Sequence, residues 1–442
     1  MKAVCYDFTI PKYLAARLLG NRFPRIHTSR LSAVSFKEVP DPRLRGPEWV
    51  LVEPRLSGIC GTDMGTITAK SSPALAPYVS FPSVMGHEVV ADVIEVGEAV
   101  DHCQPGDRVV IDPFISCYVR GLEPCPSCAR GLTARCERAA GDESGDQLQA
   151  PGMILGFCRE LPGAWAERMV VHRSQVFQVP DALSDEVAVL VEPLAVCVHA
   201  ALKRLPAPGD RVLVLGGGTI GLCMVAALRL LDLDVQIAVS VRYDFQKELA
   251  LTLGADAAFT GRDAAVQAAK AMTTVKAHRP PIGPQVYMGG FDVVYDCVGS
   301  SSSVDDALRL TRSGGSIVLV GGAGELPKID WTFVWTQELT VTGTIGYGIE
   351  TWEGRRVHTF YLTMERLLAR PDLPLGRMIT HRFSLDEYRE ALRVNLGRSR
   401  AKAIKTVFQR RPKPNVVQTV EKIAEPHKEN LSDLPQQAQG AS

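Results

Sequence analysis

The sequence predicts an α/β protein with a mostly β first half and a doubly wound parallel sheet in its second half. Up to about residue 180 the chain passes through many short β-like segments separated by Gly and Pro turns. From residue 211 onward, buried-strand patterns alternate with helical patterns, which is typical of βαβ units. A length of 442 residues is enough for two domains and a tail.

The elements of the first half are predicted from their local patterns. Residues 1–8 alternate like a strand, residues 12–19 could form a short helix between Pro11 and Pro24, and β-like patterns follow from Leu31. Residues 185–205 have a helical pattern that leads into the second half. One face of that helix carries the apolar residues Val187, Leu190, Val191, Leu194 and Val198.

A glycine-rich turn connects a strand pattern to a helix pattern at the start of the second half. Residues 211–215 read RVLVL, and Gly216, Gly218 and Gly221 follow with the spacing G-x-G-x-x-G. A turn of this kind brings backbone N–H groups close to a pyrophosphate at the positive end of a helix. The motif predicts a dinucleotide site in a Rossmann domain; the alternative is a structural turn without a ligand. Further strand patterns lie at 235–241, 291–298 and 316–320, with a helix over 245–253.

The choice between NAD and NADP depends on the end of the strand at 235–241. An NAD site usually has an Asp or Glu there, which binds the ribose 2′-hydroxyl. This chain has Ser240 and Arg242 in that region, and Asp244 comes too late. A guanidinium and a hydroxyl could hold a 2′-phosphate, so we expect NADP to be preferred over NAD. Alternatively, Arg242 lies in solvent and both cofactors are used.

Composition narrows the classes of partner. Lys and Arg together number 49, as do Asp and Glu, so the formal net charge is zero. We therefore expect no nucleic acid and no anionic membrane as partner. The start of the chain does not resemble a signal peptide, and the longest stretch free of charge, residues 212–228, is shorter than the roughly 20 residues of a membrane span. These observations favour a soluble, cytoplasmic protein with a small-molecule substrate.

Three short motifs contain candidate metal ligands. Cys60 stands in the segment CGTD, His87 and Glu88 stand in GHE, and Glu192 stands in EPL. Thiolate, imidazole and carboxylate are ligands of zinc, and a catalytic zinc site uses three protein ligands and keeps a fourth position free. Each residue alone is a weak signal, because a single Cys is usually a small buried hydrophobic residue.

Together with the glycine turn, these motifs resemble the zinc-dependent medium-chain dehydrogenase/reductase family, which includes the alcohol, polyol and threonine dehydrogenases. The resemblance covers about residues 31–408 and includes a PGDR segment at 105–108. It implies a GroES-like catalytic domain from residues 1–191 and 341–408, with the Rossmann domain, residues 192–340, inserted between them. The composition of residues 409–442, rich in Pro, Gln, Lys and Glu, predicts a disordered tail.

The resemblance also implies a catalytic zinc bound by Cys60 and His87 and completed by Glu88, Glu192 or both in turn. Glu192 stands where the alcohol dehydrogenases have a second Cys, which is similar to the polyol and threonine branch. Zinc would lower the pKa of the substrate hydroxyl, and the nicotinamide would accept a hydride.

Two residues beside Cys60 receive roles from the same resemblance. Thr62 would take the proton of the alcohol, and Asp63 would accept a hydrogen bond from the second nitrogen of His87. Many relatives have a His a few residues after the first Cys, at the outer end of a proton relay. Residues 64–66 of this chain are Met, Gly and Thr, so the sequence does not define a proton exit.

A second set of cysteines consists of Cys117, Cys125, Cys128 and Cys136. It resembles the structural-zinc lobe of the family, although the usual first position, three residues before Cys125, is Leu122. Clustered cysteines in a cytosolic protein indicate a metal rather than disulfides, so we expect a second, tetrahedral zinc. The alternatives are free thiols, or a zinc site in which Cys117 is not the fourth ligand.

The sequence thus predicts a zinc-dependent oxidoreductase that transfers a hydride between an alcohol and NAD(P). A polyol, a sugar or another secondary alcohol is the expected substrate, because of the branch to which Glu192 points. Two alternatives are a zinc-free quinone or enoyl reductase of the same superfamily and a non-catalytic NADPH-binding protein. The resemblance further implies a homodimer or homotetramer.

Overall fold

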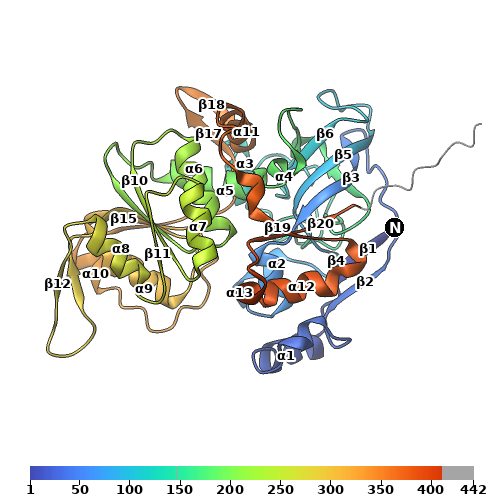
Figure 1. Ribbon diagram of the computed structural model, residues 1–442. Helices are drawn as coiled ribbons and strands as arrows, with labels where there is room; N and C mark the ends of the chain where they lie inside the picture. Colours follow the sequence, from blue (N-terminus) through green and yellow to red (C-terminus); the bar gives the residue numbers. More distant parts are fainter. Residues whose placement is uncertain (146, 411–442) are drawn as a thin grey trace, which may run out of the picture. The chain divides into compact units, whose positions relative to one another are not determined.

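A computed structural model describes residues 1–145 and 147–410 of the chain, which form two main sheets (Figure 1). The sheet of the first half has the strand order β19-β20-β3-β5-β6-β8, with β7 also paired to β3. Its strands are β3 (Trp49–Gly58), β5 (Glu88–Val96), β6 (Arg108–Ile111), β7 (Met169–His172), β8 (Val176–Gln178), β19 (Ile379–Phe383) and β20 (Lys405–Gln409). Because β20 pairs antiparallel with β3, the end of the described chain lies in the same sheet as the first half.

A small second sheet carries the N-terminus of the chain. Its order is β2-β1-β4, with β1 at Lys2–Tyr6, β2 at Val34–Glu38 and β4 at Ser83–Val84. The link from β1 to β2 contains helix α1 (Ile10–Leu19) and the 3-10 turn η1 (Pro24–Thr28). Thr9 caps α1 by accepting a hydrogen bond from the Lys12 N–H, and Pro11 follows in the first turn, where proline is well tolerated.

The second main sheet is parallel and has the order β11-β10-β9-β14-β15-β16 in the part of the chain that the structure describes. Its strands are β9 (Arg211–Leu215), β10 (Gln236–Val241), β11 (Ala257–Thr260), β14 (Phe291–Asp296), β15 (Thr311–Leu319) and β16 (Thr340–Gly343). The helices that connect them form the green-to-yellow part of the ribbon: α6 (Thr219–Leu230), α7 (Asp244–Thr252), α8 (Ala264–Met272) and α9 (Ser301–Leu310) (Figure 1). This confirms the predicted α/β class with a Rossmann sheet.

The order of the strands positions the glycine turn. From β9 the chain proceeds to β10 on one side, and β14 lies on the other side of β9. The direction of winding therefore reverses beside the carboxyl end of β9, which is where ligands bind in open α/β sheets. β16 pairs with β15 from Thr340 to Gly343, so the sheet includes residues on both sides of the expected boundary at 340.

The structure differs from the expected elements at three places. The helical pattern over 185–205 is divided into α4 (Asp185–Ala188) and α5 (Val191–Lys203). The strand expected at 316–320 begins earlier, at Thr311. The residues TRSGG at its start do not form an apolar strand pattern, so the sequence does not indicate that they belong to the strand. The hairpin of β12 (Lys276–His278) and β13 (Val286–Met288) was not expected from the sequence.

The remaining elements connect and cover the sheets. They are α2 (Gly61–Ile67), η2 (Pro73–Tyr78), α3 (Pro126–Ala129), η3 (Thr133–Arg135), η4 (Arg173–Gln175), α10 (Thr332–Thr336), β17 (Ile349–Trp352), β18 (Arg355–His358), α11 (Thr359–Ala369), η5 (Leu375–Met378), η6 (Leu385–Glu387), α12 (Tyr388–Leu396) and α13 (Arg398–Ala401). The predicted tail, apart from its first two residues, lies outside the described residues.

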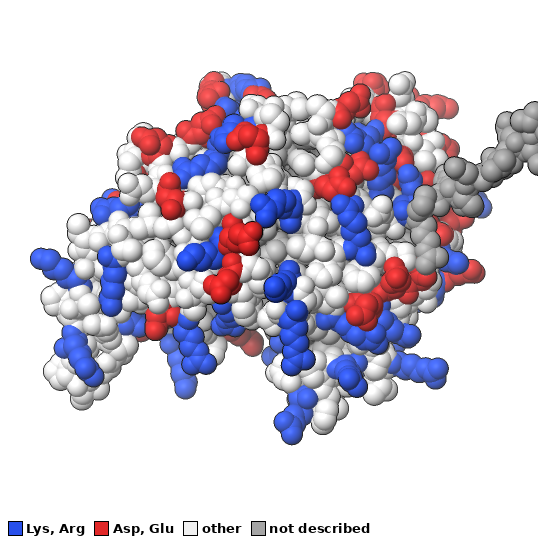
Figure 2. Space-filling view, in the orientation of Figure 1, with Lys and Arg blue, Asp and Glu red and all other residues white. Residues whose placement is uncertain are grey.

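The surface agrees with the balanced charge of the sequence. Figure 2 shows cationic and anionic side chains interspersed over most of one face, with Lys and Arg more frequent along its lower edge. Among the helices of the described residues, none combines the length and the hydropathy that a membrane crossing requires.

Candidate functional site

Cys60 lies in the turn between β3 and α2, where local hydrogen bonds hold its sulfur. The Cys60 Sγ accepts a hydrogen bond from the Thr62 N–H at 3.5 Å, and the Cys60 N–H donates to the Asp63 Oδ2 at 2.9 Å. This reciprocal capping explains why the segment CGTD starts a helix. The N-terminal end of a helix favours negative charge, so the position suits a thiolate.

His87 and Glu88 come to Cys60 from the start of the neighbouring strand β5. One ligand atom from each of Cys60, His87 and Glu88 lies within 4.8 Å of the others. The side chains of His87 and Glu88 are almost fully buried. Gly58 at the end of β3 makes room for this arrangement, because a Cβ atom there would lie 1.9 Å from the Glu88 Oε2.

Lys405, the first residue of β20, is the cationic partner of Glu88. Its ammonium group forms an ion pair with the Glu88 Oε2 and donates a hydrogen bond to the Ile59 carbonyl oxygen at 3.3 Å. Burial by itself lowers the pKa of Lys405, but the negative charge of Glu88 outweighs it and raises that pKa above its usual value. Sequence reasoning missed Lys405; its one signal is a lone Lys in the apolar segment AIKTVF.

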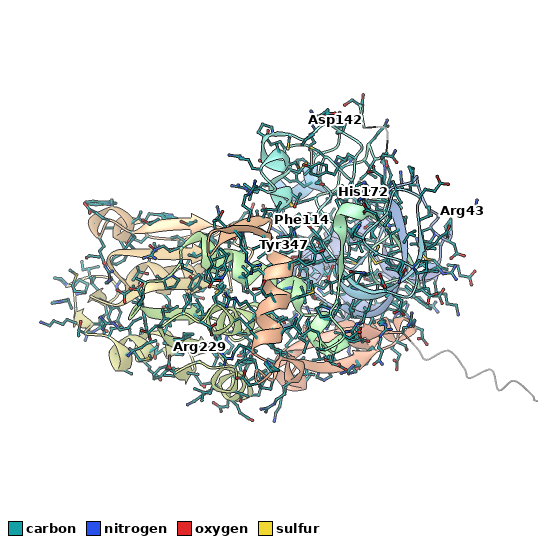
Figure 3. All side chains as sticks on the ribbon, turned by 90° about the horizontal axis from the view of Figure 1, so that it is seen from above. Arg43, Phe114, Asp142, His172, Arg229 and Tyr347 are labelled. Atoms are coloured by element: carbon teal, nitrogen blue, oxygen red, sulfur yellow. The ribbon has the colours of Figure 1, made fainter. Side chains whose placement is uncertain are left out.

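Glu192 lies in the first turn of α5 and is also buried. The Tyr347 hydroxyl donates a hydrogen bond to the Glu192 Oε1 at 3.1 Å, and the Tyr347 ring packs edge-on against Phe114 with 5.3 Å between centroids. Figure 3 labels these two aromatic residues next to each other. Burial and the negative charge of Glu88 raise the pKa of Glu192 to about 7. The charges of Glu88, His87 and Lys405 therefore act on Glu192, although Glu192 is not part of the group within 4.8 Å. Tyr347 was not identified from the sequence.

Asp63 lies beside His87 as well as under Cys60. The His87 Nδ1 and the Asp63 Oδ1 are 3.5 Å apart, which is longer than a typical hydrogen bond. Within the described part of the chain, neither of these two buried atoms has a hydrogen-bond partner. Burial lowers the pKa of His87, but the negative charges of Asp63 and Cys60 outweigh it and raise that pKa well above its usual value.

The Cys60, His87 and Glu88 group fits a zinc ion. It combines thiolate, imidazole and carboxylate donors, which are the donors that zinc prefers. A cation between these groups would offset the negative charge of the Cys60 thiolate and of the buried carboxylates, beyond what the ion pair of Glu88 with Lys405 provides. Three protein ligands would leave a fourth position for a substrate oxygen.

The four cysteines of the second set come together in one buried cluster. Their sulfur atoms all lie within 4.8 Å of one another, with 3.6 Å between those of Cys117 and Cys136. A tetrahedral zinc with Zn–S bonds of about 2.3 Å requires S···S separations of about 3.8 Å, whereas a disulfide requires about 2.05 Å. A hydrogen bond from Cys128 lowers the pKa of the Cys136 thiol to about 5. The four-cysteine cluster therefore fits a structural zinc site, with the Cys117 sulfur as the fourth available donor.

The glycine turn has the geometry of a dinucleotide site. Gly216 has a φ angle of +105°, which favours glycine, and a Cβ atom at Gly221 would lie 1.8 Å from the Gly216 carbonyl oxygen. A Cβ atom at Gly218 would have no neighbour within 4 Å. The first and third glycines therefore allow the tight turn and the close packing of α6, whereas the second faces open space before the N-terminus of α6.

Ser240 and Arg242 lie at the carboxyl end of β10, next to this turn. The Ser240 carbonyl oxygen accepts a hydrogen bond from the Gly216 N–H at 2.8 Å, and the Arg242 side chain is exposed. Asp244 is the first residue of α7, one turn beyond the strand end. The structure thus joins the backbone of Ser240 to the glycine turn and leaves Arg242 exposed just after the end of β10.

Ile404 and Lys405, which are adjacent in the chain, connect the glycine turn with the candidate zinc ligands. The Thr219 hydroxyl, directly after Gly218, donates a hydrogen bond to the Ile404 carbonyl oxygen at 3.1 Å. The next residue, Lys405, holds Glu88. The start of α6 is therefore fixed to the strand that orients one of the candidate ligands.

A cavity of about 370 Å³ is lined by residues that neighbour the candidate zinc ligands. Thr62 is part of its wall, and the Thr62 Oγ1 is 3.6 Å from the Cys60 Sγ. Phe157 is also part of the wall, and its ring lies 5.9 Å from the His87 ring. Both contacts place this cavity next to the candidate zinc ligands.

Comparisons with known proteins agree with this geometry. The family descriptions "Alcohol dehydrogenase GroES-like domain" and "Zinc-binding dehydrogenase" match residues 46–181 and 219–359. The chain is 30% identical to a sorbitol dehydrogenase of Arabidopsis thaliana over 367 residues, which cover 82% of this chain and 89% of the relative. It is 30% identical to an L-threonine 3-dehydrogenase of Aeromonas salmonicida over 356 residues, covering 80% and 90%. A zinc-binding dehydrogenase from Sinorhizobium meliloti bound to NADP is similar with a TM-score of 0.62 and 28% identity, covering 85% and 95%.

Proposed function

Because this chain belongs to the zinc-dependent alcohol dehydrogenase family of medium-chain dehydrogenases, we propose that it oxidises an alcohol to an aldehyde or ketone, and catalyses the reverse reduction. The observation that carries the proposal is the connection through Ile404 and Lys405, which joins the glycine turn to the Cys60, His87 and Glu88 group. Hydride transfer needs a dinucleotide and an activated hydroxyl side by side, and this connection supports such an arrangement.

The residues of the site would divide the work as follows. Cys60 and His87 would hold zinc, with Glu88 and Glu192 as the two carboxylates available for the third position. Bound zinc would lower the pKa of the substrate hydroxyl, and bound NAD(P) would supply the hydride acceptor. Thr62 would accept the hydroxyl proton, because its hydroxyl is the polar group of the cavity wall that lies beside Cys60. Asp63 would hold Cys60 in place by accepting a hydrogen bond from the Cys60 N–H, and it would limit the rotation of the His87 ring.

The proposal is tested by measuring zinc per chain together with the turnover of an alcohol panel. We expect two zinc ions per chain, and oxidation of at least one alcohol that a chelator abolishes. One zinc would leave either the four-cysteine cluster or the Cys60 group without metal, and the Cys60→Ala variant would identify which one. A chain that contains no zinc and oxidises no alcohol would contradict the proposal and favour the zinc-free reductase.

We also propose that NADP is preferred over NAD, because Arg242 stands exposed at the end of β10 where an NAD site has a carboxylate. The Arg242→Ala variant is expected to lower kcat/KM for NADP by about 10–100-fold, the effect of losing a hydrogen bond to a charged group, and to change the value for NAD much less. The measurement is kcat/KM with both cofactors at saturating alcohol.

Arg279 provides the matched control for this variant. It is an exposed arginine in the loop between β12 and β13, so Arg279→Ala should leave the NADP to NAD ratio unchanged. A wild-type enzyme that clearly prefers NAD would overturn the cofactor proposal and leave the proposed alcohol oxidation intact.

A further inference from the structure

We propose that the substrate carries a bulky apolar group, best an aromatic ring, beside its hydroxyl, and that residues 8–13 select this group. The inference deepens the proposed function and rests on it. It concerns the cavity next to Cys60 and the segment that leads from β1 into α1. The family match of the first half starts only at residue 46, so this segment lies outside it.

The cavity wall contains six aromatic rings, four of which contact one another in a row from Tyr6 to Tyr13. The wall includes Tyr6, Phe8, Tyr13, Tyr78, Phe81 and Phe157. The ring of Phe81 lies 4.9 Å from that of Tyr6 and 6.1 Å from that of Phe8, and Phe8 lies 5.8 Å from Tyr13. Phe157 extends the apolar wall to His87. An aromatic substituent can pack against such rings in offset or edge-on contacts.

The polar groups of the wall are the hydroxyls of its Thr, Ser and Tyr residues. In the described part of the chain, no carboxylate, ammonium, guanidinium, imidazole or carboxamide side chain lines the cavity. Thr66 and Ser71 are paired with each other at 3.4 Å, and the Ser72 hydroxyl accepts a hydrogen bond from the Ala74 N–H at 3.2 Å. A substrate hydroxyl or charge that is buried without a partner loses its hydration and gains no hydrogen bond in return, so a wall without charged groups disfavours a sugar alcohol or an amino acid.

The size of the cavity suits the same class of substrate. A benzene molecule fits in an apolar cavity of about 150 Å³, so 370 Å³ is enough for a ring and a short chain. Because Thr62 and Phe157 stand at the end next to Cys60 and His87, the hydroxyl would point to that end and the ring toward Phe8 and Phe81.

The segment with Phe8 and Tyr13 is held in place by a polar contact. The Arg17 guanidinium in α1 donates a hydrogen bond to the Ala69 carbonyl oxygen at 2.8 Å, just after α2. Thr9 caps the start of the same helix. Phe8 and Tyr13 therefore lie on the two sides of a capped helix start, with the Phe8 ring between those of Phe81 and Tyr13.

The test compares kcat/KM for 1-phenylethanol, 2-butanol, D-sorbitol and L-threonine with the zinc-loaded full-length chain. We expect 1-phenylethanol to exceed 2-butanol by about tenfold or more, and D-sorbitol and L-threonine to be the poorest substrates. In Phe8→Ala, the ratio of 1-phenylethanol to 2-butanol is expected to fall about tenfold. Phe23→Ala is the control, because Phe23 lies in the same link between β1 and β2, is exposed and does not line the cavity.

Each outcome decides a different point. D-sorbitol or L-threonine as a better substrate than 1-phenylethanol would overturn the substrate class, and an unchanged ratio in Phe8→Ala would overturn the role of residues 8–13. Failure to oxidise any of the alcohols would reject the proposed function instead. In that case a binding measurement tests the proposed aromatic substrate class. Saturation-transfer NMR with benzyl alcohol should detect binding to the wild type that Phe8→Ala weakens. The absence of saturation transfer in the wild type would overturn the aromatic substrate class.

Discussion

Replacing Thr62 by valine is expected to lower kcat by about 10²–10⁴-fold, the typical contribution of a positioned proton-transfer group, without loss of zinc. Valine has nearly the shape of threonine, so the cavity wall remains, and the N–H of residue 62 can still donate to the Cys60 Sγ. The hydroxyl alone is removed. Steady-state kcat and zinc per chain, measured on the same preparation, separate a loss of proton transfer from a loss of metal.

Thr68 provides a control at the other end of α2. Its hydroxyl donates a hydrogen bond to the Met64 carbonyl oxygen at 2.7 Å and does not line the cavity. Thr68→Val should therefore keep wild-type kcat. If Thr62→Val also kept wild-type kcat, the proton would leave the alcohol by another route, and the role of Thr62 would be rejected.

The second large effect is expected in the four-cysteine cluster. Cys136→Ser removes one of four sulfur ligands, and a structural zinc contributes directly to folding free energy because the unfolded chain has no preformed site. We expect the variant to lose one zinc ion per chain and its first thermal unfolding transition to fall by about 10 °C or more. Metal analysis and differential scanning calorimetry provide the two readouts.

Cys103→Ser is the matched control for this variant. Cys103 is a buried cysteine that packs in the core beside β5 and β6 and takes no part in either group of candidate ligands. It should keep both zinc ions and unfold closer to the wild type. Two zinc ions per chain in Cys136→Ser would show that the other three cysteines bind the metal without it, and that Cys136 is not an essential ligand.

Much of the site could be predicted from motifs whose parts lie close together in the chain. Cys60 and Asp63 are three residues apart, and their reciprocal capping depends only on the local backbone. The glycine turn has the same character, since its strand, turn and helix follow one another directly. The four cysteines lie within residues 117–136, and the structure brings their sulfur atoms together although Cys117 precedes the usual first position.

The substrate preference shows where prediction from motifs ends. Glu192 pointed to a polyol or a similar secondary alcohol by resemblance, yet a ligand motif describes the metal and not the cavity beside it. The cavity wall is made from β1, α1, η2 and the segment around Phe157, which are distant in sequence. Its apolar character could be recognised only after these segments were assembled.

The α/β class, the glycine turn and the short motifs that contain the candidate ligands follow from the order of the amino acids. These features depend on hydrogen bonds and on steric limits among residues that are neighbours in the chain, so a local pattern is sufficient to specify them. The assembled fold was needed to show that Lys405 neutralises Glu88, that Tyr347 holds Glu192 and that Phe8 faces the cavity beside Thr62. Such contacts join residues far apart in the sequence, and their positions follow from the pairing of β20 with β3 and from the packing of whole elements, which no short pattern records.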